Sequence, residues 1–358
     1  MIDTEVLEIQ RKLILDPPKF KTAEVFAFRQ FEIYGEQSYS PEGNLLIAEG
    51  KVGCIMLAGG QGTRLGFAGP KGMFPISPED HKTLFHLFAD KVAIAEKNIN
   101  RSLFIAVMTS PENHHQTVDF FKKEHFFGLQ ESQIDFFSQK TLPILDDQGN
   151  FLRDLNGDII TGPDGNGSVF EAFIESGLKE KWQQLGIEIV NIVPVDNPLA
   201  DPFDPEFMGF MKKGRYGLSV KAIFREDPKE SVGVLVEKEG KLQVIEYTEL
   251  NDSEKIARDD AGQLKHRCAN ITLLALDINE IRRVLLPLHL AHKAISHVGD
   301  DSPKRPNAWK FEKFIFDIFP LIERIGVLVY PRKKCFAPLK NLTGPDSVDT
   351  VRQALELK

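Results

Sequence analysis

The fold is decided by the stretch Leu57-Ala58-Gly59-Gly60-Gln61-Gly62-Thr63-Arg64-Leu65-Gly66, which is closed by Gly69-Pro70-Lys71-Gly72. The apolar run before it, Val52-Gly53-Cys54-Ile55-Met56, is typical of a buried parallel strand. Glycines without a Cβ let the backbone turn sharply and bring its N–H groups against a ligand. Arg64 offers a rigid fork of donors, and Lys71 offers a mobile point charge. Together, the strand, the loop and the two cations predict a site for the base and phosphates of a nucleotide.

Two common glycine loops are excluded by the spacing. A dinucleotide-binding fingerprint starting at Gly60 would need a further glycine where Leu65 stands. A P-loop would need Gly-Lys-Ser/Thr after four variable residues, and the chain contains no such string. The simpler alternative is a strand-to-helix turn with incidental charges, and the order of three glycines, Thr63, Arg64 and Lys71 argues against it.

Composition describes an ordinary globular protein. The chain has 358 residues, of which 42% are hydrophobic and 27% charged, enough for a large α/β core with one or two appendages. Its net charge of −8 argues against nucleic acid as a partner. Three cysteines argue for a reducing compartment. The acidic N-terminus does not read as a signal peptide, and no apolar run approaches a membrane span, so we expect a cytoplasmic protein without a membrane partner.

From Lys51 onward, apolar strands alternate with amphipathic helices, which predicts a mainly parallel α/β sheet. A hairpin turn at Glu239-Gly240-Lys241 predicts that the strands on either side of it pair in antiparallel fashion. The expected strands are 52–56, 103–108, 134–137, 188–195, 217–224, 232–236, 242–245 and 325–330, with another opening at Cys268. The expected helices are 83–98, 113–124 and 169–184, and 141–165 is expected to be a loop or small hairpin.

Asp196 directly follows the clearest central strand, 188–195. Ligands gather beyond the carboxyl ends of strands in open α/β sheets, so this carboxylate is well placed to hold a divalent metal. The competing reading is a helix cap, and that role fits Asp204 better.

The glycine stretch resembles the signature of the UDP-sugar pyrophosphorylase family, in particular its UDP-N-acetylglucosamine pyrophosphorylase branch. By motif order the resemblance extends from about Gly53 to Asn341. It implies an α/β fold with a Rossmann-like, GT-A-like nucleotidyltransferase sheet and a smaller antiparallel sugar-binding part. It also implies that the uridine triphosphate lies against Leu57, Ala58, Gly59, Gly60, Gln61, Gly62 and Thr63.

The resemblance also implies roles for residues further along the chain. Gln139 would read the uracil edge, which suits a carboxamide that both donates and accepts. Gly165 would admit the nucleotide, although Asn and Gly also make ordinary turns and caps. The remaining implied roles are phosphate neutralisation by Arg64, Lys71 and Lys340, a possible phosphate contact at Lys221, sugar binding by Asn166, Glu246 and Asn270, and Mg²⁺ on Asp196.

We expect three parts: an N-terminal, mainly helical segment at 1–45, a catalytic domain at 46–341 with its antiparallel sugar-binding part at 226–270, and a C-terminal tail at 342–358. The segment could cover the glycine loop or serve as a packing arm, and the second is favoured. Eukaryotic members of the resembled family carry a further C-terminal domain, so properties that depend on it do not transfer.

The resemblance implies a uridylyltransferase that makes UDP-N-acetylglucosamine and pyrophosphate from UTP and N-acetylglucosamine-1-phosphate, with Mg²⁺ assisting in-line attack on the α-phosphate. The alternatives are glucose-1-phosphate or a broad range of sugars as substrate and, more distantly, a non-catalytic sugar-nucleotide sensor. The expected partners are these two substrates, and the expected state is a monomer or weak homo-oligomer.

Overall fold

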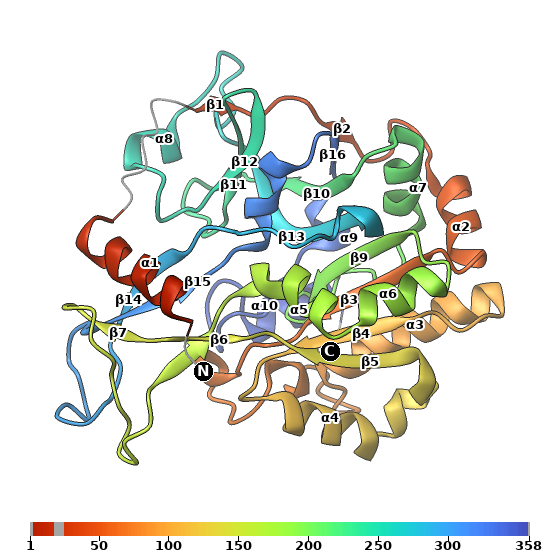
Figure 1. Ribbon diagram of the computed structural model, residues 1–358. Coiled ribbons are helices and arrows are strands. Elements are labelled where there is room, and N and C mark those ends of the chain that lie inside the picture. The colour runs from red at the N-terminus through yellow and green to blue at the C-terminus, as the bar shows by residue number, and fades with distance from the viewer. Residues whose placement is uncertain (1–2, 18–24, 357–358) are drawn as a thin grey trace.

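The computed structural model describes residues 3–17 and 25–356, and its centre is an eleven-stranded sheet with helices on both faces (Figure 1). Eight strands form one path, in the order β2 (Glu32–Ile33), β16 (Ile325–Val329), β10 (Leu218–Phe224), β13 (Cys268–Asp277), β9 (Ile189–Pro194), β3 (Val52–Leu57), β4 (Ile105–Thr109) and β5 (Ile134–Ser138). On this path only β13 runs against its neighbours. The predicted mainly parallel α/β sheet is therefore confirmed.

Strand β3 shows how the sequence builds both faces of the sheet. Cys54 and Met56 contribute to one apolar core, whereas Ile55 and Leu57 contribute to the other, because successive side chains of a strand alternate. The first core is covered by α2 (Ser40–Ala48), α3 (Leu84–Ile99), α4 (His114–Lys123), α7 (Pro205–Gly214) and α10 (Val348–Ala354). The second is covered by α5 (Val169–Glu175), α6 (Leu178–Gln184) and the 3₁₀ segment η8 (Ile315–Leu321).

The predicted hairpin is present as β11 (Val234–Lys238) and β12 (Lys241–Ile245). It is not a separate sheet, because β11 also pairs with β13 and with β1 (Phe26–Ala27). The separate antiparallel sheets are β14 (His289–Lys293), β15 (Ala308–Glu312) and β7 (Leu145–Asp146), and β6 (Thr141–Pro143) with β8 (Thr161–Pro163). The shorter helical turns are η2 (Thr63–Leu65), η3 (Lys71–Met73), η4 (His125–Gly128), η5 (Glu131–Gln133), η6 (Asn166–Ser168), η7 (Ile278–Glu280), α8 (Asp252–Ile256) and α9 (Arg332–Cys335).

The N-terminal segment is less helical than expected. Helix α1 (Thr4–Leu15) and α2 are present, but β1 and β2 lie between them and extend the central sheet. Helix α1 packs Leu7 against Leu145 and Phe311 of the three-stranded sheet and against Leu288, just before β14, as a packing arm would. Residues 1, 2, 18–24, 357 and 358 of the predicted segment and tail lie outside the described residues.

The helix expected over 169–184 is broken into α5 and α6 at Gly177, whose φ of +76° is left-handed and easily adopted by glycine. The expectation that Asp204 caps a helix is confirmed, because its side chain accepts from the backbone N–H groups of Glu206 and Phe207 at the start of α7. No helix among the described residues is long and apolar enough to cross a membrane.

Candidate active site

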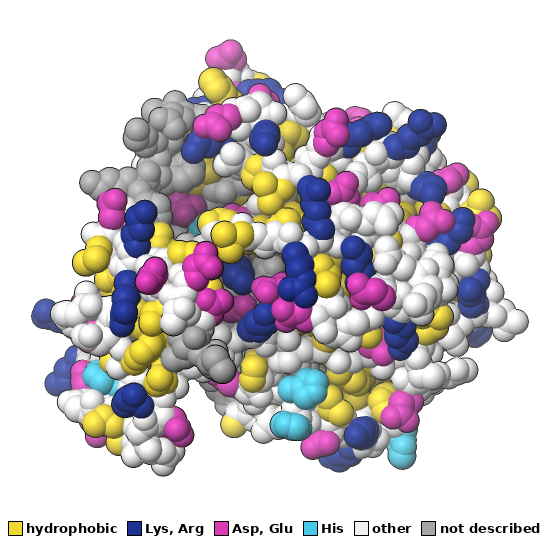
Figure 2. Space-filling model, viewed as in Figure 1, with side chains coloured by type: hydrophobic (Ala, Val, Ile, Leu, Met, Phe, Trp, Pro, Cys, Tyr) yellow, Lys and Arg dark blue, Asp and Glu magenta, His cyan; other side chains and the backbone are white. Residues whose placement is uncertain are grey.

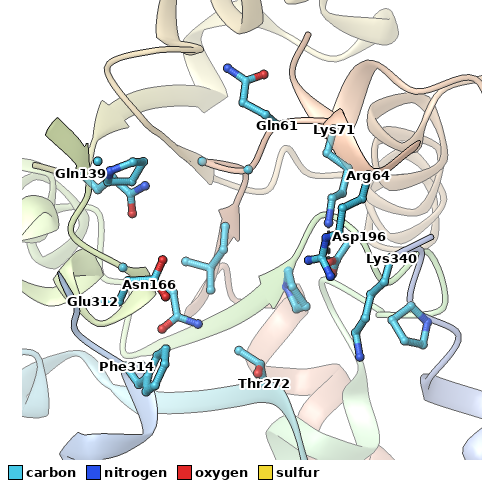
Figure 3. A pocket seen from close by; sticks show the side chains of 18 of the residues that line it. Gln61, Arg64, Lys71, Gln139, Asn166, Asp196, Thr272, Glu312, Phe314 and Lys340 are labelled. Carbon is cyan, nitrogen blue, oxygen red and sulfur yellow. Dashed lines mark hydrogen bonds and ion pairs between the residues drawn. The ribbon is translucent and has the colours of Figure 1, made fainter. Parts of the chain in front are cut away.

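A cleft of about 840 Å³ lies at the carboxyl ends of β3, β5 and β9. Figure 3 shows Arg64, Lys71, Asp196 and Lys340 on one side of it and Gln139, Asn166, Glu312 and Phe314 on the other. The predicted residues that line it are Leu57, Gly59, Gly60, Gln61, Thr63, Arg64, Lys71, Gln139, Gly165, Asn166, Asp196, Glu246, Asn270 and Lys340. The topology therefore brings together residues that are as much as 283 positions apart in the sequence (340 − 57).

The glycine loop is held in shape by its own backbone. The Gly62 N–H donates to the Gly69 carbonyl at 2.9 Å, and the Lys71 N–H donates to the Gly60 carbonyl at 3.0 Å. These bonds join the two ends of the sequence motif and place Lys71 beside the loop. Ala58 and Gly62 were predicted to contact the nucleotide but are not among the residues that line the cleft. Ala58 is buried and its N–H donates to the Met108 carbonyl, so it anchors the loop to β4.

Asn113 supports the glycine loop and was missed by the sequence analysis. It stands at the start of α4, yet its side chain makes no bond to that helix. The fully buried amide instead donates from Nδ2 to the Ala58 carbonyl at 3.0 Å and to the Gly60 carbonyl at 3.4 Å. Its Oδ1 accepts from the Ser110 N–H. A polar residue soon after a parallel strand is the only signal that the sequence offers.

Gln139 lies at the end of β5 and is buried against Gly59. A Cβ at Gly59 would be 2.6 Å from the Gln139 Nε2 atom, closer than real Cβ contacts. The glycine is therefore required for the carboxamide to lie where it does. Gln139, which is expected to read the uracil edge, therefore lies directly against the glycine loop.

We expect Gly59→Ala to displace the Gln139 carboxamide, the flexible end of a side chain, without unfolding the protein. The KM for UTP should rise about tenfold, as expected when a few hydrogen bonds to the base are lost. Steady-state kinetics of Gly59→Ala, Gln139→Ala and the double variant test this expectation. The double variant should be no worse than Gln139→Ala alone, because both changes remove the same interaction. Additive losses would show that Gly59 acts independently of Gln139.

One side of the cleft is charged. The Lys71 Nζ lies 3.0 Å from the Asp196 Oδ2, and both side chains are partly exposed to the cleft. The Lys340 Nζ lies 3.1 Å from the Asp346 Oδ2. Arg64 lines the cleft and makes no ion pair with any described residue. Basic and acidic side chains are interspersed over the face shown in Figure 2, whereas Arg64, Lys71 and Lys340 all line the cleft.

Lys221, predicted as a possible phosphate contact, does not line the cleft. It is buried in β10, and its ammonium lies 2.5 Å from the Asp204 Oδ2. Nearby, the Tyr330 hydroxyl donates to the same Asp204 oxygen at 2.9 Å. The Lys221 ammonium is already paired with Asp204 in the core. We therefore infer that Lys221 holds the loop that follows β9 in place and does not bind phosphate.

The predicted sugar-binding residues form another part of the cleft wall. The Asn166 Oδ1 accepts from the Ile315 N–H at 2.9 Å, and the Asn270 Oδ1 accepts from the Thr272 N–H at 3.2 Å. Neither Nδ2 has a hydrogen-bond partner among the described residues, so each can donate to a ligand. Burial raises the pKa of Glu246, and the adjacent Glu249 carboxylate adds to this effect. Glu246 lines the cleft, where its carboxyl oxygens can accept a hydrogen bond.

A β-bulge shapes this wall. Lys221 pairs with Leu273 but the next residue, Ala222, pairs with Asn270, so two residues of β13 bulge out of the ladder. Thr272, one of them, has a φ of +58°, which is unusual for a β-branched residue. Bulges redirect side chains next to functional sites, and both Asn270 and Thr272 line the cleft here.

The sequence analysis also missed the contribution of β15 and the residues after it. It assigned no role to this part of the chain, yet Lys310, Glu312 and Phe314 line the cleft. The Lys310 Nζ and Glu312 Oε1 are 2.7 Å apart. Phe311 between them is buried under α1. This alternation of outward polar and inward apolar side chains was a usable signal of a half-buried strand.

Asp164, just before Gly165, is 1% exposed, and its Oδ1 has no hydrogen-bond partner among the described residues. Burial raises its pKa to about 6, although Lys313 lies 3.8 Å away. A carboxyl whose pKa is higher in the folded than in the unfolded protein stabilises the fold least above the folded pKa. We therefore expect Asp164→Asn to increase the free energy of unfolding by about 1–3 kcal/mol at pH 8.

The gain should shrink as the pH falls through about 6 toward the ordinary pKa of an aspartate, because the carboxyl then becomes neutral in the folded wild type. Urea denaturation of both proteins between pH 4 and pH 8 measures the difference. A gain that did not vary with pH would mean that packing rather than ionisation separates the two proteins.

Comparisons with known proteins identify the family of this chain. Residues 16–344 match the family described as UTP–glucose-1-phosphate uridylyltransferase. The UDP-N-acetylglucosamine pyrophosphorylase of Saccharomyces cerevisiae is 37% identical over 340 residues, covering 89% of this chain and 71% of the yeast protein. The crystal structure of the uridine diphosphate N-acetylglucosamine pyrophosphorylase of Trypanosoma brucei, in complex with an inhibitor, has 28% identity and a TM-score of 0.83, covering 98% of this chain and 75% of that one. The chain thus belongs to the UTP–glucose-1-phosphate uridylyltransferase family.

Proposed function

We propose that this protein transfers the uridylyl group of UTP to N-acetylglucosamine-1-phosphate and releases pyrophosphate. The observation that carries the proposal is that a single cleft gathers the kinds of group that the reaction needs. Gln139 and Asn166 lie across the cleft from Arg64, Lys71, Asp196 and Lys340, and the glycine loop, Glu246 and Asn270 line the same cleft. The names of the yeast and trypanosome relatives support the choice of sugar. Within this function, the parallel strands serve as a Rossmann-like, GT-A-like nucleotidyltransferase sheet.

The chemistry needs two anions to meet. An oxygen of the sugar phosphate attacks the α-phosphorus of UTP, and the bond to the β-phosphate oxygen breaks in line. Arg64, Lys71 and Lys340 neutralise the charge on the reacting and leaving oxygens. Orientation supplies the rest, because Gln139 holds the base while Glu246 and Asn270 hold the sugar. No nucleophilic side chain is needed, so the product forms in one displacement.

Asp196 fits a divalent metal. One of its oxygens pairs with Lys71, and the other is open to the cleft. Among the described residues, no group of three or more His, Cys, Asp or Glu side chains is gathered to hold a metal. Mg²⁺ commonly binds through one or two carboxylates, with substrate phosphates and water completing its shell, so a lone aspartate is sufficient. When bound, the ion would supply charge between the reacting phosphates.

A panel of sugar-1-phosphates tests the proposal. With UTP and Mg²⁺, pyrophosphate release should be fastest with N-acetylglucosamine-1-phosphate. The main alternative is glucose-1-phosphate, which the description of the family favours. Equal or faster release with glucose-1-phosphate would replace the proposed sugar, and no release with any sugar would leave a sugar-nucleotide sensor. A cytoplasmic location and a monomeric or weakly oligomeric state stay predictions.

A further inference from the structure

His289 joins three segments behind the sugar-facing wall of the cleft. It lies on β14 and is not among the residues that line the cleft. Its Nε2 lies 2.9 Å from the Asp317 Oδ2 in η8, and its Nδ1 lies 3.8 Å from the Glu249 Oε1 in the turn after β12. Its ring also packs on Phe314, with the ring centroids 4.4 Å apart.

Two of the contacts lead to groups that line the cleft. Phe314 lines it directly. Glu249 accepts the backbone N–H of Glu246 at 3.1 Å, and Glu246 lines it as well. An imidazolium between Asp317 and Glu249 therefore ties the turn that carries Glu246 to the segment that carries Phe314. A neutral imidazole would leave two carboxylates close together with no cation between them.

We propose that His289, as an imidazolium held between Asp317 and Glu249, is a positioning residue that fixes Glu246 and Phe314 for the sugar phosphate. This inference rests on the proposed function, since it assigns that wall to the sugar. His289 touches neither substrate, so its loss should weaken sugar binding and leave nucleotide binding unchanged.

The surrounding charges fit this role. Burial alone would lower the pKa of His289, but the hydrogen bond to Asp317 and the nearby Glu249 carboxylate raise it to about 9. Glu312 stands opposite His289 in the β15 register, and Glu246 adds another negative charge behind Glu249. The charged form is thus favoured across the neutral range and is lost as the pH rises through about 9.

His292 provides a matched control on the same strand. Its ring stacks on Trp309, with the centroids 4.2 Å apart, and its Nε2 lies 2.9 Å from the Asp147 Oδ1. It therefore makes the same two kinds of contact as His289, an aromatic stack and a carboxylate pair. Neither of its partners lines the cleft.

His289→Gln should raise the KM for the sugar-1-phosphate about tenfold and leave the KM for UTP within about twofold. His292→Gln should change neither. In the wild type the KM for the sugar should rise as the pH passes about 9, and His289→Gln should lack this step. An unchanged sugar KM in His289→Gln, or equal losses for both substrates, would overturn the proposal.

Asp317→Asn tests the same contact if His289→Gln fails to fold. It keeps an oxygen for the Nε2–H but removes the charge, so the rise in sugar KM should begin at a lower pH than in the wild type; an unmoved rise would count against the proposal. Failure of the proposed function itself would be seen separately, as absence of pyrophosphate release by the wild type. In that case calorimetric binding of UDP-N-acetylglucosamine and of UDP to the same variants replaces the two KM values.

Discussion

Lys71→Ala is expected to reduce kcat by at least 10²–10³-fold, or ~3–4 kcal/mol, which is the usual effect of removing one preorganised charge from a transition state. The Lys71 ammonium lies at the cleft, 3.0 Å from Asp196 and on the same side as Arg64 and Lys340. Pentavalent phosphorus and the leaving pyrophosphate concentrate negative charge there as the reaction proceeds. Because this charge grows toward the transition state, kcat should fall more than the KM values change.

The fold should survive this substitution. Lys71 is on a short turn at the cleft, its side chain is partly exposed, and its only ion-pair partner among the described residues is Asp196. Single-turnover kinetics and thermal unfolding of Lys71→Ala measure the two effects separately. Lys82→Ala is the control, because Lys82 follows soon in the chain but pairs with Asp80 and Asp90 outside the cleft. Near-normal turnover in Lys71→Ala would remove the phosphate assignment.

The residues that sequence analysis placed well share a local signal. The glycine loop, Gln139 and Asp196 each follow a recognisable apolar strand, and the carboxyl ends of parallel strands meet at one edge of a sheet. For such residues, knowing the strands is nearly enough to know the site. The family resemblance then supplied their roles, which spacing alone does not give.

The residues that were misplaced or missed depend on contacts between distant segments. Lys221 was offered as a phosphate contact because the family resemblance implied it, but its ammonium pairs with Asp204, which caps helix α7. Glu312 and Phe314 line the cleft only because β15 pairs with β7, more than 150 residues earlier (308 − 146 = 162). No local sequence pattern predicts such pairing. The aromatic-rich segment that carries Glu312 and Phe314 therefore looks like ordinary core in the sequence.

Gly165→Ala is expected to have the other large effect, lowering the free energy of unfolding by about 3–5 kcal/mol and weakening sugar binding with it. Gly165 has a φ of +95°, which disfavours any residue with a Cβ. In addition, a Cβ there would lie 2.3 Å from the Lys313 carbonyl oxygen and 2.7 Å from the Lys313 nitrogen. These are backbone atoms, so the conflict cannot be relieved by turning a side chain.

The same contact is a small ladder that fixes the sugar-facing wall. The Lys313 N–H donates to the Asp164 carbonyl at 2.7 Å, and the Gly167 N–H donates to the Lys313 carbonyl at 3.0 Å. Asn166, between them, holds the Ile315 N–H through its side chain. A Cβ at Gly165 would force residues 164–167 away from Lys313. This movement should displace Asn166 together with the neighbouring Phe314.

Gly177→Ala separates the steric clash from the backbone strain. Gly177 also has a positive φ, +76°, but a Cβ there would meet no atom within 4 Å. The free energy of unfolding of Gly177→Ala should therefore fall only by the cost of a positive φ in a residue with a Cβ, about 1–2 kcal/mol. Urea denaturation gives both free energies, and the sugar KM gives the effect on the wall. If the two variants lost the same free energy of unfolding, the positive φ alone would explain the loss in Gly165→Ala, and the close approach to Lys313 would contribute nothing to it. If Gly165→Ala also kept a normal sugar KM, the ladder would serve only the fold, and the placement of Asn166 would need another cause.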